Sequence, residues 1–169
     1  AWCMSNMPSW VLSAHLPRQK TKRALPDPDQ QIIDLGSGSA GAQLAVVYHF
    51  FHDKFDEVDP VISRVIKAAI KKQILDPYLN PEVQRPNWWL GYDITSNNVI
   101  NNWNPWCNGD SMLCFLLMEK DPSRLRAAIE QGLRSVDTFM NYTKDDGCCD
   151  EGTVYWQHAA GKMFCMLKT

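Results

Sequence analysis

The chain has 169 residues, of which 45% are hydrophobic and 21% charged, and its formal net charge is −2. These values are typical of one globular domain with an ordinary hydrophobic core. The near-neutral charge and the lack of a long Lys or Arg run argue against nucleic-acid binding. No uninterrupted apolar run approaches the roughly 20 residues that span a bilayer, so we expect no membrane-spanning segment.

The first 29 residues are rich in Trp, Pro and polar residues and show no sustained hydrophobic period. Four prolines break any long helix and favour an extended course over the surface, namely Pro8, Pro17, Pro26 and Pro28. Within this segment, Trp10 and His15 are candidates for lining a ligand cleft. The alternative for His15 is a purely structural hydrogen bond.

Two helices are predicted next. Apolar residues recur at helical spacing over residues 32–52 and again over residues 60–75, where Asp59 provides a cap and Pro60 the first helical position. A nearby glycine group resembles a phosphate-binding loop only superficially, because it lacks the Walker lysine and a preceding strand. We interpret its members as small residues that permit close helix packing: Gly36, Gly38 and Gly41.

A polar and aromatic stretch, residues 97–110, is predicted to be a loop before the next helix. Asn amides donate and accept hydrogen bonds, and indoles offer flat apolar faces, so together they suit a neutral or anionic polyhydroxyl ligand such as a sugar. Alternatively, the Asn residues cap turns and the Trp residues fill gaps between helices. The candidates here are Asn101, Asn102, Trp103, Asn104, Trp106 and Asn108.

A second pair of helices is predicted at residues 111–118 and from Asp121-Pro122 to Tyr142, and a fifth helix from Thr153 to the end of the chain. No alternating strand pattern competes with these helices. The sequence therefore predicts an all-α fold of antiparallel helical hairpins in one domain, residues 1–169.

The stretch from Asp145 to Gly161 is the densest in reactive side chains. Tyr155 and His158 are three residues apart, and on a helix this spacing puts both on one face, near enough to act on one substrate. Glu151 and Trp156 lie in the same stretch. The alternative is that the aromatic residues pack in the core and His158 is an ordinary surface histidine.

Cysteine and histidine give little sign of a metal site. The six cysteines include no CxxC pair, and adjacent Cys148 and Cys149 are an awkward pair to bridge. We predict free, mostly buried thiols, with one long-range disulfide as the alternative. His49 and His52 are three residues apart, a spacing that more often marks a polar helix end than a metal site. We expect no metal and no other cofactor.

Three of these motifs together resemble the helical domain of heparinase II/III-type polysaccharide lyases. They are Trp10 to Leu16, Asn101 to Gly109, and Asp146 to Trp156. The resemblance implies an incomplete α/α toroid of helical hairpins, normally followed by a β-sandwich domain that is absent here. Because the chain lacks an initiator Met and stops within an apolar helical pattern, we expect a piece of a longer lyase. The family implies a periplasmic or secreted location.

The resemblance implies β-elimination on an acidic, uronate-containing polysaccharide such as a glycosaminoglycan or an alginate-like polymer. Tyr155 matches the family's proton-donating tyrosine, which sometimes also serves as the base. A phenol, with an ordinary pKa of about 10, is a competent donor once its site lowers that value. The family neutralises the substrate carboxylate with an Asn or His in the stretch that corresponds to residues 101–104. No His is present there, so the role falls to Asn101, Asn102 or Asn104.

Further residues complete the expected site. His158 is an additional local candidate for catalysis, although the resemblance does not require it, and another His of the family lies beyond Thr169. The candidates for binding the polysaccharide are Trp10, His15, Trp103, Trp106, Asn108, Glu151 and Trp156.

Two other functions remain open. The missing His in the Asn stretch is also consistent with a glycan-binding or scaffold domain that has lost catalysis. An α/α-toroid glycoside hydrolase would instead use paired carboxylates from Asp110, Asp150 or Glu151. Turn capping and solvation explain the same three acids without catalysis.

Overall fold

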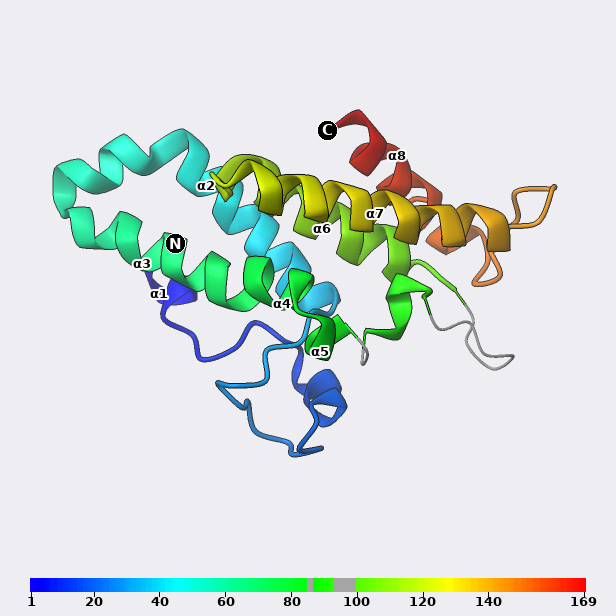
Figure 1. Ribbon diagram of the computed structural model, residues 1–169, viewed down its shortest axis with the longest axis horizontal. Coiled ribbons are helices and arrows are strands. Elements are labelled where there is room, and N and C mark those ends of the chain that lie inside the picture. Colours follow the sequence, from blue (N-terminus) through cyan, green and yellow to red (C-terminus); the bar gives the residue numbers. More distant parts are fainter. Residues whose placement is uncertain (85–86, 93–99) are drawn as a thin grey trace.

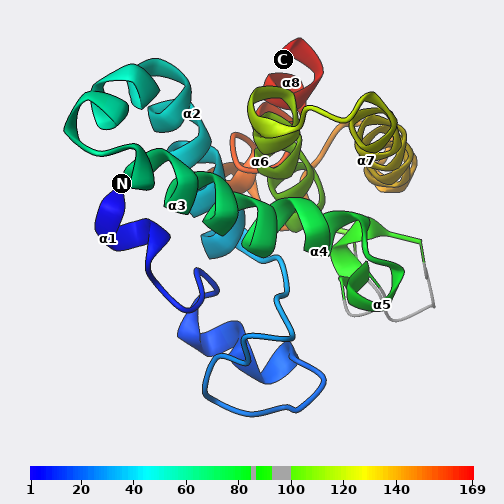
Figure 2. The same cartoon turned by 60° about the vertical axis from the view of Figure 1, so that its left-hand side comes forward.

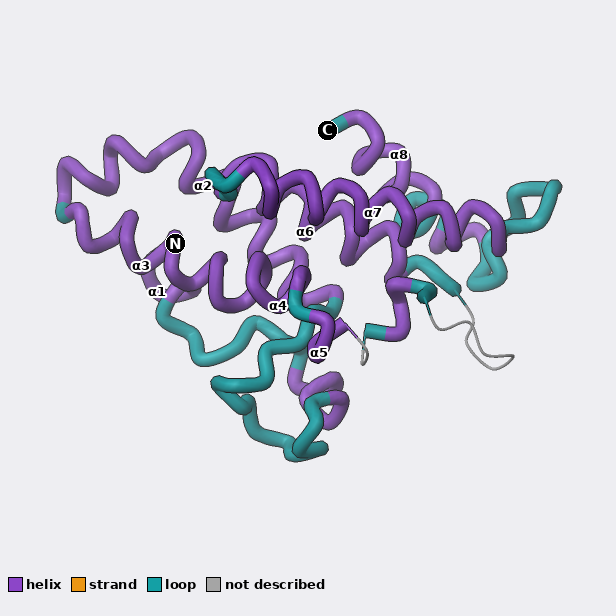
Figure 3. The backbone as a smooth tube through the Cα atoms, in the orientation of Figure 1, coloured by secondary structure: helices purple, strands orange, loops and turns teal. Residues whose placement is uncertain are grey.

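The computed structural model describes residues 1–84, 87–92 and 100–169. These residues form helices, turns and irregular segments, and none of them lies in a strand (Figure 3). The all-α prediction is therefore confirmed. Over the same residues, no helix combines the length and the apolar character needed to cross a membrane. The part of the polar stretch at residues 97–99 lies outside the described residues.

The N-terminal segment contains only short helices, as its prolines predict. These are α1 (Trp2–Ser5) and the 3-10 helix η1 (Ser13–Arg18), and the chain is otherwise irregular as far as Asp34. Trp10 anchors this segment: its backbone N–H donates to Gln73 Oε1 at 2.8 Å and its indole Nε1 donates to the Met4 carbonyl at 2.7 Å. Its side chain belongs to the hydrophobic core and is only 5% exposed.

The first helical hairpin consists of α2 (Leu35–Val58) and α3 (Pro60–Ile70), which lie side by side (Figure 1). Asp34 begins α2 through a reciprocal capping box with Ser37, and the helix therefore starts three residues after the predicted position. Asp59 caps α3 as predicted. The last five predicted residues form a π-helical turn, η2 (Lys71–Leu75), and the helical path continues past the predicted end into α4 (Asp76–Leu79).

Two short elements, α5 (Pro81–Gln84) and η3 (Trp88–Leu90), lead toward the second hairpin, α6 (Trp103–Met118) and α7 (Pro122–Tyr142). The predicted start of α6 at residue 111 is wrong, because most of the polar stretch is helical. The fifth helix is also shorter than predicted. Residues Thr153–Tyr155 form a 3-10 turn, η4, and α8 (Ala160–Lys168) begins only after further turns.

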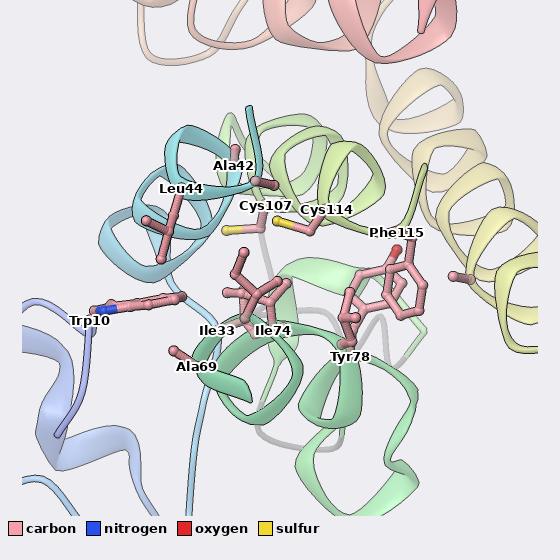
Figure 4. Close-up of a cluster of buried hydrophobic side chains, with 14 of the residues drawn as sticks. Trp10, Ile33, Ala42, Leu44, Ala69, Ile74, Tyr78, Cys107, Cys114 and Phe115 are labelled. Atoms are coloured by element: carbon pink, nitrogen blue, oxygen red, sulfur yellow. The ribbon is translucent and has the colours of Figure 1, made fainter. Parts of the chain in front are cut away.

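Helix α6 occupies the centre of the molecule, between α2 and α7, with α8 packed alongside (Figure 2). The close approach of the helices depends on Gly41, where an added Cβ would lie 2.6 Å from Ile74 Cγ1 and 3.2 Å from Cys114 Sγ. This confirms the packing role predicted for that glycine. Ile74, Cys107 and Cys114 meet at the centre of the main core (Figure 4).

The six cysteines, all within the described residues, are free thiols. Cys107 and Cys114 are fully buried, and burial raises the pKa of each thiol well above its ordinary value. The expectation that most cysteines are buried is wrong, since Cys3, Cys148 and Cys165 are exposed and Cys149 is half-buried.

Candidate functional site

Two tryptophans in the first turn of α6 each hold a histidine and a cation. Trp103 contacts the His15 ring, with centroids 4.7 Å apart, and the Arg18 guanidinium lies 4.8 Å from its ring centroid. Trp106 stacks on His158, with centroids 5.0 Å apart and planes within 10°. Lys162 Nζ lies 4.7 Å from the Trp106 ring centroid. The start of α6 thus carries two aromatic platforms flanked by positive groups.

A buried carboxylate orients His15. Asp34 Oδ2 lies 2.6 Å from His15 Nδ1 and also accepts the Leu12 N–H at 3.0 Å, while Oδ1 caps α2 by accepting the Ser37 N–H at 2.8 Å. The Asp34 side chain is 1% exposed, whereas that of His15 is 21% exposed. His15 therefore has the structural hydrogen bond of the simpler interpretation and keeps an edge open to solvent.

Three helices fix the Trp106 platform. Its indole Nε1 donates to Ser39 Oγ on α2 at 2.9 Å, and this hydroxyl donates to Asp110 Oδ2 on α6 at 2.7 Å. Lys162 from α8 completes the group by donating to Asp110 Oδ1 at 3.1 Å. These three hydrogen bonds link Trp106, Ser39, Asp110 and Lys162, and they hold the plane of Trp106, on which His158 stacks, in place.

Tyr155 reaches the same platform through His158. The two rings meet edge to face, with centroids 6.1 Å apart and planes at 64°. The contact matches the three-residue spacing, although η4 and a turn produce it rather than the predicted α-helix. Tyr155 is 39% exposed and Trp156 52% exposed, so neither fills the core. The phenol is accessible to a ligand beside a fixed imidazole.

The Asn residues divide into two groups. Asn104 and Asn108 are completely buried: Asn104 Nδ2 donates to the Trp89 and Ser135 carbonyls at 2.8 and 2.9 Å, and Asn108 Nδ2 donates to Ser135 Oγ at 2.7 Å. Tyr78 donates its hydroxyl proton to Asn108 Oδ1 at 2.7 Å. We therefore correct the expectation that these two amides contact a substrate, because they have no surface open to one.

Asn101 and Asn102 differ from this pair because both line a cavity. Asn101 is half-buried, and its Oδ1 accepts the Trp103 N–H at 3.1 Å. Asn102 is 3% exposed, and its backbone N–H donates to Glu151 Oε2 at 3.3 Å. The fully buried Oδ1 of Asn102 has no hydrogen-bond partner. Asn104 Oδ1 is likewise buried and without a partner, so this property does not by itself mark a ligand site.

Asn101, Asn102, Glu151 and Trp156 line a common cavity of about 610 Å³. The cavity lies between the end of α7, the following loop and the start of α8, and the residues that line it do not include Tyr155 or His158. Trp10 does not line this cavity either, since its side chain belongs to the hydrophobic core. The sequence-predicted residues therefore form two neighbouring features: the aromatic platforms and this cavity.

Several site residues were not foreseen. Ser39 and Lys162 have no sequence signal, since each acts only through contacts made between helices. Asp34 could have been found, because Asp followed three residues later by Ser is a possible capping box at a helix start. In the described ranges, no group of three or more His, Cys, Asp or Glu side chains is placed to hold a metal ion.

No protein-family model matches the chain, and no curated protein matches it.

Proposed function

We propose that the chain is part of a polysaccharide lyase that cleaves uronate-containing polysaccharides by β-elimination, with Tyr155 as the proton-transfer residue. One observation carries the proposal: the exposed Tyr155 phenol meets the edge of His158, and that ring is stacked on the fixed Trp106 platform. An acid–base pair beside a flat aromatic surface is suited to a sugar ring.

The chemistry assigns a role to each group. A base removes the C5 proton of the uronate, the electron pair forms the C4–C5 double bond, and the C4–O4 bond breaks as O4 receives a proton. Tyr155 protonates O4, and neighbouring His158 is the local candidate for the base. His158 then releases its proton to solvent and the Tyr155 phenolate takes one up, which restores both groups. Asn101 remains the amide available to neutralise the uronate carboxylate, since Asn104 is buried.

The positive groups at the platforms agree with an anionic substrate. Arg18 and Lys162 place a guanidinium and an ammonium over Trp103 and Trp106. Such charges raise the local concentration of an acidic polymer and orient its carboxylates. In this proposal the two hairpins are part of an α/α toroid in a longer periplasmic or secreted lyase, and other parts of that protein complete the site.

The test is a Tyr155→Phe substitution in the longest natural protein that contains these residues. The proposal expects loss of the ultraviolet absorbance that unsaturated uronate products generate, with glycan binding retained. Tyr142→Phe is the matched control, because Tyr142 is also a partly exposed phenol but hydrogen-bonds Asp150 instead of contacting a histidine. Full elimination activity in the Tyr155→Phe protein would contradict the assignment.

A glycan-binding domain without catalysis is the second candidate. It is favoured by the burial of Asn104 and Asn108, which leaves few amides to neutralise a carboxylate. Glycan-array binding by the unmodified protein without product formation would support this candidate over the lyase. A glycoside hydrolase has less support, because Asp110 is held by Ser39 and Lys162.

A further inference from the structure

The cavity beside α7 and α8 has the size and floor of a small-molecule site. Its volume of about 610 Å³ falls in the range of roughly 300–1,000 Å³ that is usual for ligand pockets. Ile100, Phe139 and Ala159 form a small buried cluster along it, and Met163 packs against them. This cluster is separate from the main core, so the cavity presents an apolar surface that a ligand could cover.

The rim of the cavity is strongly acidic. Four carboxylates stand against one ammonium, Lys144, so the lining carries a formal charge of −3. Lys144 Nζ lies 3.8 Å from Asp150 Oδ1. Among the described residues, no cation forms an ion pair with the other three acids, which are Asp145, Asp146 and Glu151. Carboxylates gathered without counter-ions repel one another, and a bound cation would relieve that repulsion.

The indole of Trp156 also favours a cation, because it lines the cavity and is 52% exposed, and the face of an indole attracts ammonium groups. Asn102 lines the cavity too, but its side-chain Oδ1 is fully buried and is not open to a ligand there. Carboxylates and an indole thus surround one apolar space.

We propose that this cavity binds an organic ammonium ion with an apolar body. The apolar part covers the Phe139 and Met163 floor, and the ammonium group lies among the rim carboxylates near Trp156. Charge complementarity selects this occupant, because an anion entering the same space would meet the net negative rim. The inference does not rest on the lyase proposal. The two proposals meet at Asn101, which lines this cavity, so a bound ammonium ion would compete with a uronate carboxylate for that amide.

The first experiment compares three ligands of one shape with the unmodified chain. Naphthylmethylammonium, naphthylmethanol and naphthylacetate share an aromatic body and differ in charge, and isothermal titration calorimetry gives their dissociation constants. The proposal expects the ammonium to bind most tightly, the alcohol roughly tenfold more weakly, and the acetate not at all. The affinity for the ammonium ligand should also fall as salt is added. Equal binding by the alcohol or the acetate, or no binding by the ammonium, would overturn the proposal.

The second experiment removes rim charge without changing shape. Asp145→Asn combined with Asp146→Asn should weaken ammonium binding roughly tenfold, about threefold for each exposed carboxylate several ångströms from the ligand. The matched control is Asp53→Asn with Asp56→Asn near the C-terminal end of α2, and neither residue lines the cavity. Figure 1 shows that end of α2 and the loop after α7 on opposite sides of the molecule. It makes the same change in net charge and should leave the affinity unaltered.

An unchanged affinity in the rim variant, or an equal loss in the control, contradicts the proposal. Asn at position 146 keeps an oxygen to accept the Cys148 N–H, which Asp146 Oδ1 accepts at 2.9 Å. Circular dichroism checks that each variant is folded. If the rim variant does not fold, the comparison of the three ligands still decides the question with the unmodified protein.

Discussion

Replacing Asn104 with Ala tests whether the amides of α6 hold the core or serve the substrate. The Asn104 side chain is completely buried, and its two amide hydrogens reach the carbonyls of Trp89 and Ser135, with Ser135 Oγ also 3.0 Å away. The substitution removes both hydrogen bonds and leaves a space that no neighbour fills. We therefore expect a loss of stability rather than a specific loss of activity.

The expected magnitude follows from these contacts. Two hydrogen bonds contribute about 1 kcal/mol each. Leaving the buried Trp89 carbonyl without a hydrogen-bond donor costs about 1 kcal/mol, and the space left by the missing amide group costs about the same. Removing Asn104 Oδ1, which is buried without a partner, returns about 1 kcal/mol. The net loss is about 3 kcal/mol, a substantial part of the roughly 5–15 kcal/mol that stabilises a typical domain.

Urea unfolding followed by circular dichroism measures this loss. A change of about 3 kcal/mol corresponds to a melting temperature lower by roughly 6–12 °C for a chain of this size. Asn101→Ala is the comparison, since Asn101 only caps the Trp103 N–H and its loss should cost about 1 kcal/mol. If Asn104→Ala loses less than Asn101→Ala, the burial argument is refuted and Asn104 returns as a candidate for binding the carboxylate.

Two further predictions concern packing and burial. Because burial raises the pKa of Cys107 and Cys114, their thiols ionise first in the unfolded chain. Their contribution to the free energy of unfolding is therefore complete below about pH 8.5. Above that pH the free energy of unfolding falls by up to about 1.4 kcal/mol per pH unit for each thiol. Urea unfolding at neutral and alkaline pH measures this dependence, and a free energy of unfolding that does not change with pH contradicts the prediction. Gly41→Ala should lower stability by about 1–3 kcal/mol, because the new Cβ would press on the branched side chain of Ile74. Gly132→Ala should cost less, because the nearest atom to its new Cβ is the flexible end of Met112. A larger loss of melting temperature for Gly132→Ala than for Gly41→Ala would contradict this prediction.

The hairpins could be predicted because their signals are local. Asp59 and Asp121 each accept the backbone N–H two residues later at 2.8 Å, and each precedes a proline at the first helical position. These caps and the apolar stripes beside them depend only on neighbouring residues. The same holds for the Tyr155 and His158 contact, which follows from a three-residue spacing even without a regular helix.

The start of α6 could not be predicted because distant residues determine it. Asn is a weak helix former, since its side chain competes for backbone hydrogen bonds, and this favours a loop over residues 101–110. In the fold, Ser135 and Tyr78 bind the Asn108 side chain from α7 and α4. Their hydrogen bonds offset the poor propensity. Tertiary contacts also bring Trp106, Ser39, Asp110 and Lys162 together, and no spacing in the sequence predicts this arrangement.

The buried amides and the half-buried tryptophans of α6 depend on each other. Asn104 and Asn108 fix the position of α6 against α7, so Trp103 and Trp106 in the same turns keep one orientation. A site held by packed and hydrogen-bonded neighbours needs little rearrangement when a ligand arrives. Asn104 and Asn108, which the sequence suggested as ligand-binding residues, therefore act indirectly. Their side chains hold α6 in place, and α6 positions Trp103 and Trp106.

The charges beside these platforms then separate two kinds of ligand. Arg18 and Lys162 lie over Trp103 and Trp106, where they favour an anionic polymer. The four rim carboxylates disfavour the same polymer at the cavity, whose lining includes Trp156, the residue after Tyr155. An acidic polysaccharide that reaches Tyr155 would therefore approach from the side of the two platforms. The cavity favours a cation, and a cation bound there would compete with a uronate carboxylate for Asn101, which lines the cavity.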